Sequence, residues 1–223
     1  MKTFWILAPW LPYWLNSGHL LGRCEFLNGM ELVRARPVNG EFLQNELPTL
    51  QIEFAAEDFD PDCFDWNGFT LVSETMRQAM ALGPSDIQYF DVDSSRAAPL
   101  PRSKRYQIMH VPVTEDVSDP ERSEYSLRHR PEGVELFGYP GAIAFRPDAE
   151  PVHEIFYDRF FKVVFCTDEF ALRVLRAECT GMRFLDPVDL RSWKRFRTLR
   201  GVEEREWDRA RKTFRNKLIQ EIP

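Results

Sequence analysis

Two segments of the chain repeat the same order of apolar and polar positions. They are LVSETMRQAMALGPSDIQYFDV at residues 71–92 and FCTDEFALRVLRAECTGMRFLDP at residues 165–187, which align with a one-residue gap. In each segment an apolar stretch precedes an apolar face at i, i+4 spacing, and a second apolar stretch follows. The pattern predicts strand, short helix and strand twice, as an internal duplication rather than a solenoid, which needs at least three copies.

A hydroxyl residue followed by an acid opens each predicted helix. Ser73 and Thr167 suit the N-cap position, where a side-chain oxygen accepts from a helix N–H, and the following acid suits the positive end of the helix. The second copy adds Cys166 to give a cluster of reactive residue types, for which catalysis is the alternative reading. Because the first copy has Val72 in place of Cys166, we interpret the cluster as a cap beside a buried thiol.

The N-terminal part of the chain is typical of short strands separated by turns. Residues 3–8 predict a first strand, and the segments 24–27 and 30–38 predict a hairpin around Asn28-Gly29. The apolar start resembles a signal peptide, but prolines interrupt it and no small-residue cleavage motif follows. We therefore expect a strand there, and no stretch has the roughly 20 apolar residues of a membrane-spanning helix.

The middle of the chain predicts further strands and two polar connections. The predicted strands are 106–119 as one half-buried strand, 134–147 as a hairpin around Tyr139-Pro140-Gly141, and 153–165 as a strand leading into the second repeat. The predicted connections are 93–105 and 120–133. The fold we expect is α+β, a mixed and largely antiparallel sheet with two strand–helix–strand units and a C-terminal helical pair. Residues 1–190 form one domain in this interpretation, and residues 191–223 form a helical extension packed on it.

Composition supports a buried core without covalent staples. The 223 residues are 43% apolar and include 18 Phe, which is ample for a core at this length. Four cysteines, at positions 24, 63, 166 and 179, show neither a CxxC motif nor paired spacing. We expect buried free thiols and a reducing compartment.

Charge divides the chain into an acidic body and a basic end. Residues 191–223 carry 11 basic and 5 acidic side chains, and the rest of the chain carries 18 basic and 30 acidic ones. An acidic body repels nucleic acid and attracts a basic partner. We interpret the arginines of the basic end as a solvated helix face, with nucleic-acid binding as the alternative.

The segment 53–65 concentrates acids and aromatic rings. Its sequence EFAAEDFDPDCFD holds six carboxylates and predicts a loop, without the glycine and closing Glu of a calcium-binding EF-hand. A solvated acidic loop is one interpretation, and a patch presented to a basic partner is the other.

Catalytic motifs are missing from the sequence. There is no HExxH, GxSxG, phosphate-binding loop or zinc-type cysteine grouping, so we expect neither a metal nor a cofactor. His110 stands within a predicted strand and suggests a hydrogen-bonded core group. An enzyme with a carboxylate or histidine site remains an alternative, which requires a deep pocket where such groups converge.

Three stretches together resemble immunity protein family 11 of bacterial polymorphic toxin systems. The stretches are Leu71-Val72-Ser73-Glu74 to Asp86-Ile87-Gln88-Tyr89-Phe90, then Tyr106-Gln107-Ile108-Met109-His110-Val111 with Asp119 and Ser123-Glu124-Tyr125, and finally Thr167-Asp168-Glu169-Phe170 to Thr180-Gly181-Met182-Arg183-Phe184. The resemblance covers residues 66–190, with a weaker match at the first strand and none at 25–65 or in the C-terminal helices.

The resemblance implies a non-enzymatic cytoplasmic protein that neutralises a cognate toxin domain by binding it. Such toxins are delivered by contact-dependent or type VI secretion systems, and no membrane association is implied. Many of them act on nucleic acid and are basic, which suits an acidic inhibitor. From chemistry alone we expect toxin contacts in the acidic segment, because aromatic rings and carboxylates make strong contact sites. The expected toxin-binding residues are Asp58, Asp60, Asp62, Asp65 and Trp66.

Overall fold

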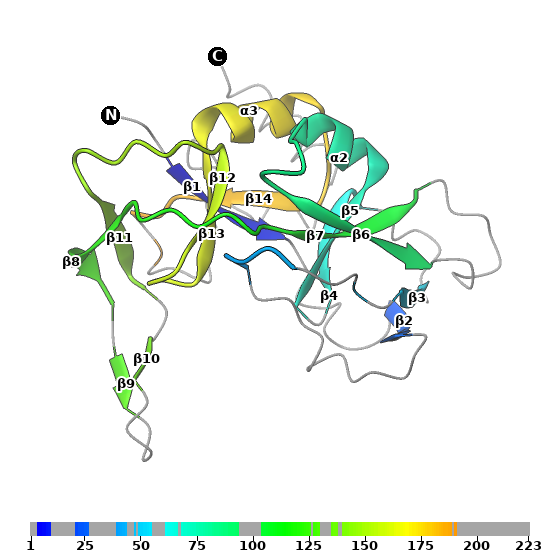
Figure 1. Ribbon diagram of the computed structural model, residues 1–223, viewed down its shortest axis with the longest axis horizontal. Coiled ribbons are helices and arrows are strands. Elements are labelled where there is room, and N and C mark those ends of the chain that lie inside the picture. The colour runs from blue at the N-terminus through cyan, green and yellow to red at the C-terminus, as the bar shows by residue number, and fades with distance from the viewer. Residues whose placement is uncertain are drawn as a thin grey trace, which may run out of the picture.

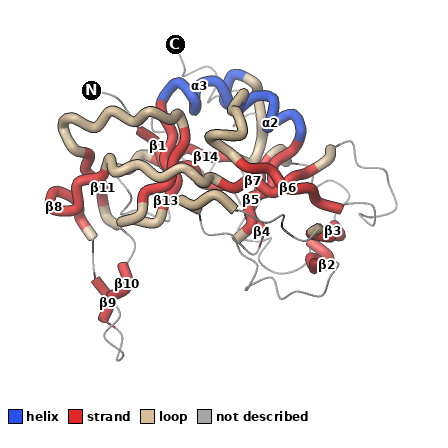
Figure 2. The backbone as a smooth tube through the Cα atoms, viewed as in Figure 1, coloured by secondary structure: helices blue, strands red, loops and turns tan. Residues whose placement is uncertain are grey.

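The structure, a computed structural model, consists mainly of strands with two helices lying over one side of them (Figures 1 and 2). It describes residues 4–9, 21–26, 39–43, 47, 49–54, 61–66, 68–93, 104–125, 127–129, 135–137, 140–188 and 190. The α+β class expected from the sequence is therefore confirmed for this part of the chain. Neither of its helices has the length and apolar character needed to cross a membrane.

A six-stranded sheet forms one half of the described fold. Its strands, in spatial order, are β2 (Leu21–Phe26), β3 (Leu50–Phe54), β6 (Gln88–Asp93), β7 (Tyr106–His110), β5 (Phe69–Ser73) and β4 (Cys63–Trp66). Neighbouring strands are antiparallel except β3 and β6, which are parallel. The sheet is mixed and largely antiparallel, as the sequence predicts.

A four-stranded antiparallel sheet forms the other half. Its spatial order is β12 (Ile155–Asp158), β13 (Val163–Thr167), β1 (Phe4–Pro9) and β14 (Met182–Leu185). Strand β1 confirms the predicted first strand. The segment 153–165 is not one strand, because β12 and β13 form a hairpin within it.

The two repeated segments share one topology. The first contains β5, helix α2 (Glu74–Met80) and β6, and the second contains β13, helix α3 (Asp168–Arg176) and β14. In each, the two strands flank a third, antiparallel strand, and a hairpin partner lies outside the first strand. The resulting spatial orders are β4-β5-β7-β6 and β12-β13-β1-β14. The predicted strand–helix–strand units are confirmed, and we call them unit one and unit two.

Both helices begin at the predicted caps. The Ser73 hydroxyl accepts from the Met76 N–H at 3.1 Å, and the Thr167 hydroxyl accepts from the Phe170 N–H at 3.3 Å. The backbone of each cap is extended, as an N-cap requires. These contacts explain the hydroxyl and acid in each segment without catalysis.

One core cluster joins the two units. Met76 and Met80 of α2 pack in the same cluster as Phe170 and Val174 of α3, and all four side chains are at most 1% exposed. Fully burying an apolar side chain of this size contributes about 1.5–3 kcal/mol. The i, i+4 apolar faces read from the sequence therefore face this shared core.

The region between the units differs from the sequence prediction. Strands β8 (Ser118–Glu124) and β11 (Ala142–Phe145) pair with each other, and so do β9 (Leu127–His129) and β10 (Glu135–Phe137). The predicted hairpin around Tyr139-Pro140-Gly141 is wrong, because its two halves belong to different pairs. The polar loop predicted at 120–133 is also wrong over β8 and β9.

Two further elements have other bounds than the sequence predicts. The strand predicted over 106–119 ends at His110, and the loop predicted over 53–65 contains the ends of β3 and β4. Strand β2 pairs with β3. The predicted turn at Asn28-Gly29 and the C-terminal helical pair lie outside the described residues.

Candidate functional site

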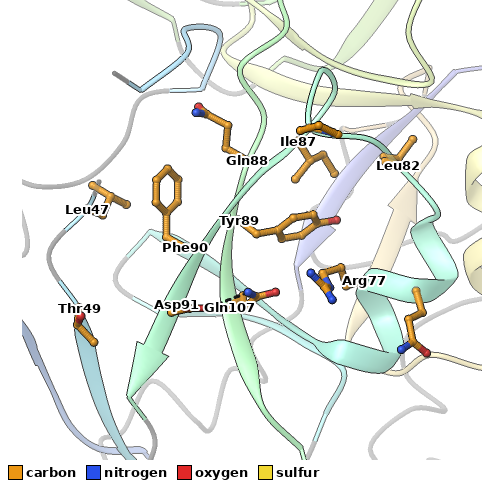
Figure 3. A pocket seen from close by; sticks show the side chains of 12 residues that line it. Leu47, Thr49, Arg77, Leu82, Ile87, Gln88, Tyr89, Phe90, Asp91 and Gln107 are labelled. Carbon is orange, nitrogen blue, oxygen red and sulfur yellow. Dashed lines mark hydrogen bonds between the residues drawn. The ribbon is translucent and has the colours of Figure 1, made fainter. Parts of the chain in front are cut away.

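A recess of about 860 Å³ lies beside β6 in unit one (Figure 3). Its walls come from α2, the turn after α2, β6, β7 and the residues that lead into β3. The lining residues are Leu47, Thr49, Arg77, Gln78, Leu82, Pro84, Ile87, Gln88, Tyr89, Phe90, Asp91 and Gln107.

The recess opens where β3 and β6 separate. The two strands pair at Leu50 with Val92 and at Gln51 with Asp93, at the end of β6. Over residues 88–91, the described pairing of β6 is with β7 alone. Leu47 and Thr49 continue the β3 side of the recess opposite this part of β6 (Figure 3). One edge of β6 therefore faces the recess.

Arg77 forms the polar wall on the α2 side. Its Nη2 donates to Glu74 Oε1 at 2.8 Å, and its guanidinium carbon lies 5.7 Å from the centre of the Tyr89 ring. The hydrogen bond to Glu74 raises the pKa of Arg77, so the side chain stays charged. Gln78 also donates to Glu74 Oε1, at 3.0 Å. The pair with Glu74 and the ring of Tyr89 together hold the guanidinium at the edge of the recess.

Tyr89 and Asp91 supply two further polar groups from one face of β6. Burial raises the pKa of Tyr89 to about 12, so the hydroxyl keeps its proton near neutral pH. That hydroxyl is buried and has no hydrogen-bond partner among the described residues. Asp91 accepts from Gln107 Nε2 at 2.8 Å, and its side chain is exposed.

Unit two lacks this polar wall. Its helix and closing strand carry apolar residues where unit one carries Arg77, Gln78 and Tyr89; the aligned residues, in the same order, are Ala171, Leu172 and Phe184. Ala171 and Phe184 are at most 1% exposed, and Leu172 packs on the core cluster. This difference is visible in the aligned sequences, and it is the signal by which α2 and β6 could have been found from the sequence.

Asp62, one of the five residues expected to contact a toxin, is 5% exposed and bonded within the fold. Its carboxylate accepts from the Ser73 hydroxyl at 2.8 Å and from the Thr180 N–H at 2.9 Å, and Lys104 Nζ lies 3.1 Å away. Burial raises the pKa of Asp62, but the hydrogen bonds and the charge of Lys104 outweigh it and leave the pKa below its usual value. Asp62 therefore ties β4 to both units.

The other four expected contact residues are not brought together by described contacts. Asp65 lies in β4, where its carboxylate accepts from the Gly68 N–H at 3.1 Å and stabilises the turn to β5. The backbone of Trp66 ends β4. Asp58 and Asp60 lie outside the described residues. In the strand order, β4 and the recess-lining β6 are separated by β5 and β7.

Cys63, Cys166 and Cys179 are buried free thiols. Burial raises the pKa of Cys63 and Cys166 well above the usual value, and raises that of Cys179 to about 12. A thiol that keeps its proton is a poor nucleophile. The prediction of buried thiols at positions 166 and 179 is confirmed.

Two histidines whose side chains the structure describes, His110 and His153, make structural contacts. His110 is fully buried, and its Nε2 donates to the backbone oxygen of Glu41 at 2.8 Å. Its burial and this hydrogen bond confirm the interpretation of a hydrogen-bonded core group, and burial lowers the pKa of His110. His153 Nδ1 lies 2.7 Å from Glu115 Oε1, whose carboxylate also accepts the His153 backbone N–H.

The side chains that line the recess define its chemistry. Among the described residues that line it, Arg77 and Asp91 are charged and none is a histidine or cysteine. Within the described part of the chain, no group of His, Cys, Asp and Glu side chains is arranged to hold a metal ion. The recess offers two aromatic, three amide and two charged side chains beside a strand edge, which suits binding.

Comparisons with known proteins give one finding. A family model described as Immunity protein family (Imm11) matches residues 27–189. The match extends over the segment 27–65, for which the sequence resemblance gave no counterpart. Comparison with curated protein sequences finds no match.

Proposed function

The chain belongs to the Imm11 immunity protein family, and we propose from this membership that it binds and neutralises a cognate toxin domain without catalysing a reaction. The observation that carries the proposal is the match over residues 27–189, which includes both strand–helix–strand units. The toxin belongs to a polymorphic system of the contact-dependent or type VI kind, and inhibition takes place in the cytoplasm of the producing cell.

Charge supports a basic toxin partner. Residues 1–190 carry 18 basic and 30 acidic side chains, so the body of the protein attracts a basic domain and speeds its encounter. Once bound, an inhibitor of this kind covers the toxin's active site.

The acidic segment 53–65 remains a proposed part of the contact surface. Asp58, Asp60, Asp65 and Trp66 are the residues we propose for it. Asp62 holds the base of that segment, because its carboxylate is bonded to Ser73 and Thr180.

Co-expression tests the proposed function directly. The toxin domain encoded beside this chain is induced in a bacterial host with and without the full-length protein. We expect growth to be rescued and the two proteins to co-purify in a stoichiometric complex. Unrescued growth, with both proteins folded and expressed, would refute the proposal.

A further inference from the structure

Over residues 88–91, the edge of β6 that faces the recess has no strand partner among the described residues, so another polypeptide strand fits there. Residues 88–91 pair with β7 on one side, and the recess lies on the other. A strand edge presents backbone N–H and C=O groups that an added strand satisfies. Four residues of strand extend over about 10 Å, which sets the length of the available edge. We propose that an extended segment of the toxin binds in this recess and joins β6 as an additional strand. This inference rests on the proposed function.

The walls of the recess suit the alternating side chains of a strand. Figure 3 shows Leu47, Thr49 and Phe90 on one side of the recess and Arg77 with Tyr89 on the other. Successive side chains of an added strand point to opposite faces of the sheet. One set meets the apolar wall of Leu47 and Phe90, and the other set meets the polar wall of α2.

An exposed aromatic residue lies next to the segment that contacts the start of β6. The Gln88 side chain exchanges two hydrogen bonds with the backbone of Leu43, at 2.9 and 3.2 Å, which fixes that segment beside the start of β6. The next residue back, Phe42, is 56% exposed. Aromatic side chains of this kind are frequent among the residues that dominate protein interfaces.

The charges beside the recess indicate which charge the bound segment carries. Arg77 is already paired with Glu74 at 2.8 Å, whereas Asp91 is exposed and bonded only to the neutral Gln107 among the described contacts. A Lys or Arg of the added strand opposite Asp91 forms a favourable cross-strand pair. The acidic balance of residues 1–190 favours the same sign. The occupant is therefore an extended segment that combines apolar residues with a basic one.

Unit two differs from unit one at the positions that form the polar wall. Ala171, Leu172 and Phe184 replace the polar wall with packed apolar side chains. Phe184 stacks edge-on against Phe170, with ring centres 6.3 Å apart, and is 1% exposed. The aligned Tyr89 instead borders the recess. At these aligned positions the side chains of unit two are packed in the core, whereas those of unit one line the recess.

Residue-resolved amide hydrogen exchange tests the inference. Exchange is measured by NMR on the full-length chain, free and in complex with the toxin domain encoded beside it. We expect alternate amides of residues 88–91 to slow at least about 10-fold in the complex, because amides on one strand edge recur every second residue. A complex that leaves all four amides unchanged overturns the inference and leaves the proposed function standing. Failure to form any complex overturns both.

A steric variant gives an independent result. Thr49 is exposed and lines the recess, so Thr49→Trp fills the recess without disturbing the core. We expect toxin affinity to fall about 100-fold, as for loss of a dominant contact. Val188→Trp is the matched control, because Val188 is 62% exposed and follows β14 in the other sheet. Equal affinity of both variants and the wild type overturns the inference. Sedimentation of the free protein gives a second check. If a second copy of this chain occupies the β6 edge, so that the protein self-associates and Thr49→Trp does not act through toxin binding, the inference is also overturned.

Discussion

Unit one and unit two have the same strand order and the same type of helix cap, but they differ in what lies beside the closing strand. In unit two, β14 and α3 carry Phe184 and Ala171, which are buried in the shared core. In unit one, the aligned positions carry Tyr89 and Arg77, which line an open recess. The strand order and the helix caps are common to both units, and three of the differences line the recess of unit one. This contrast separates what the fold needs from what is available for binding.

Glycine substitutions in the turn after each helix give the largest expected difference between the units in the free energy of unfolding. A Cβ on Gly181 would overlap the backbone oxygen of Cys63, and the residue has φ of +86°. Gly83 in unit one has ordinary clearance, with its nearest atoms 3.7 and 3.8 Å away. We expect Gly181→Ala to lower the free energy of unfolding by about 3 kcal/mol or more, and Gly83→Ala to change it by at most about 0.5 kcal/mol. Urea denaturation measures both, and equal effects would contradict the close approach between β4 and unit two.

Asp62 connects the units and gives the next largest effect. Asp62→Asn leaves Ser73, Thr180 and Lys104 without their carboxylate, so we expect a loss of about 2–4 kcal/mol at pH 7. Because the folded-state pKa of Asp62 lies below its unfolded value, its contribution is full above about pH 4 and is lost as the pH falls through the folded pKa.

Unfolding measured from pH 7 to pH 3 checks the pH dependence. The difference between wild type and Asp62→Asn should narrow in acid. A difference that is constant with pH would show that the carboxylate charge is not what stabilises the junction.

The helix caps give a smaller contrast between the units. Thr167→Ala removes one cap bond and should cost about 1 kcal/mol. Ser73→Ala should cost about 1 kcal/mol more, because the Ser73 hydroxyl also donates to the buried Asp62 carboxylate. Thermal and urea unfolding of the two variants provide the comparison. A larger loss for Thr167→Ala would refute this ranking.

Local features of the fold were predictable from the sequence, whereas partners from distant parts of the chain were not. The caps Ser73 and Thr167 depend on neighbours three residues away, and the sequence places them correctly. The middle strands of the units come from elsewhere, β7 after unit one and β1 from the start of the chain. The hairpin predicted around Tyr139-Pro140-Gly141 failed because β11 pairs with β8, which no local turn pattern reveals.

The candidate site likewise combines features that the sequence predicts with features that depend on distant parts of the chain. Asp62 was expected at a toxin surface, yet Thr180, which lies 118 residues later, holds its carboxylate inside the fold. The recess depends on the separation of β3 from β6, which is a property of the sheet. The polar residues at Arg77, Gln78 and Tyr89 were nevertheless visible in the alignment of the two repeats.

The central claim is that the toxin binds on the recess side of unit one. The most direct test replaces the polar wall of unit one by the aligned residues of unit two. The full-length variant carries Arg77→Ala, Gln78→Leu and Tyr89→Phe together, and its dissociation constant for the adjacent toxin domain is measured by calorimetry. A control variant carries Leu172→Gln in unit two, and circular dichroism verifies both folds. We expect the triple variant to bind about 100-fold more weakly and the control to bind as the wild type does. Wild-type affinity in a folded triple variant would contradict the assignment of toxin binding to unit one.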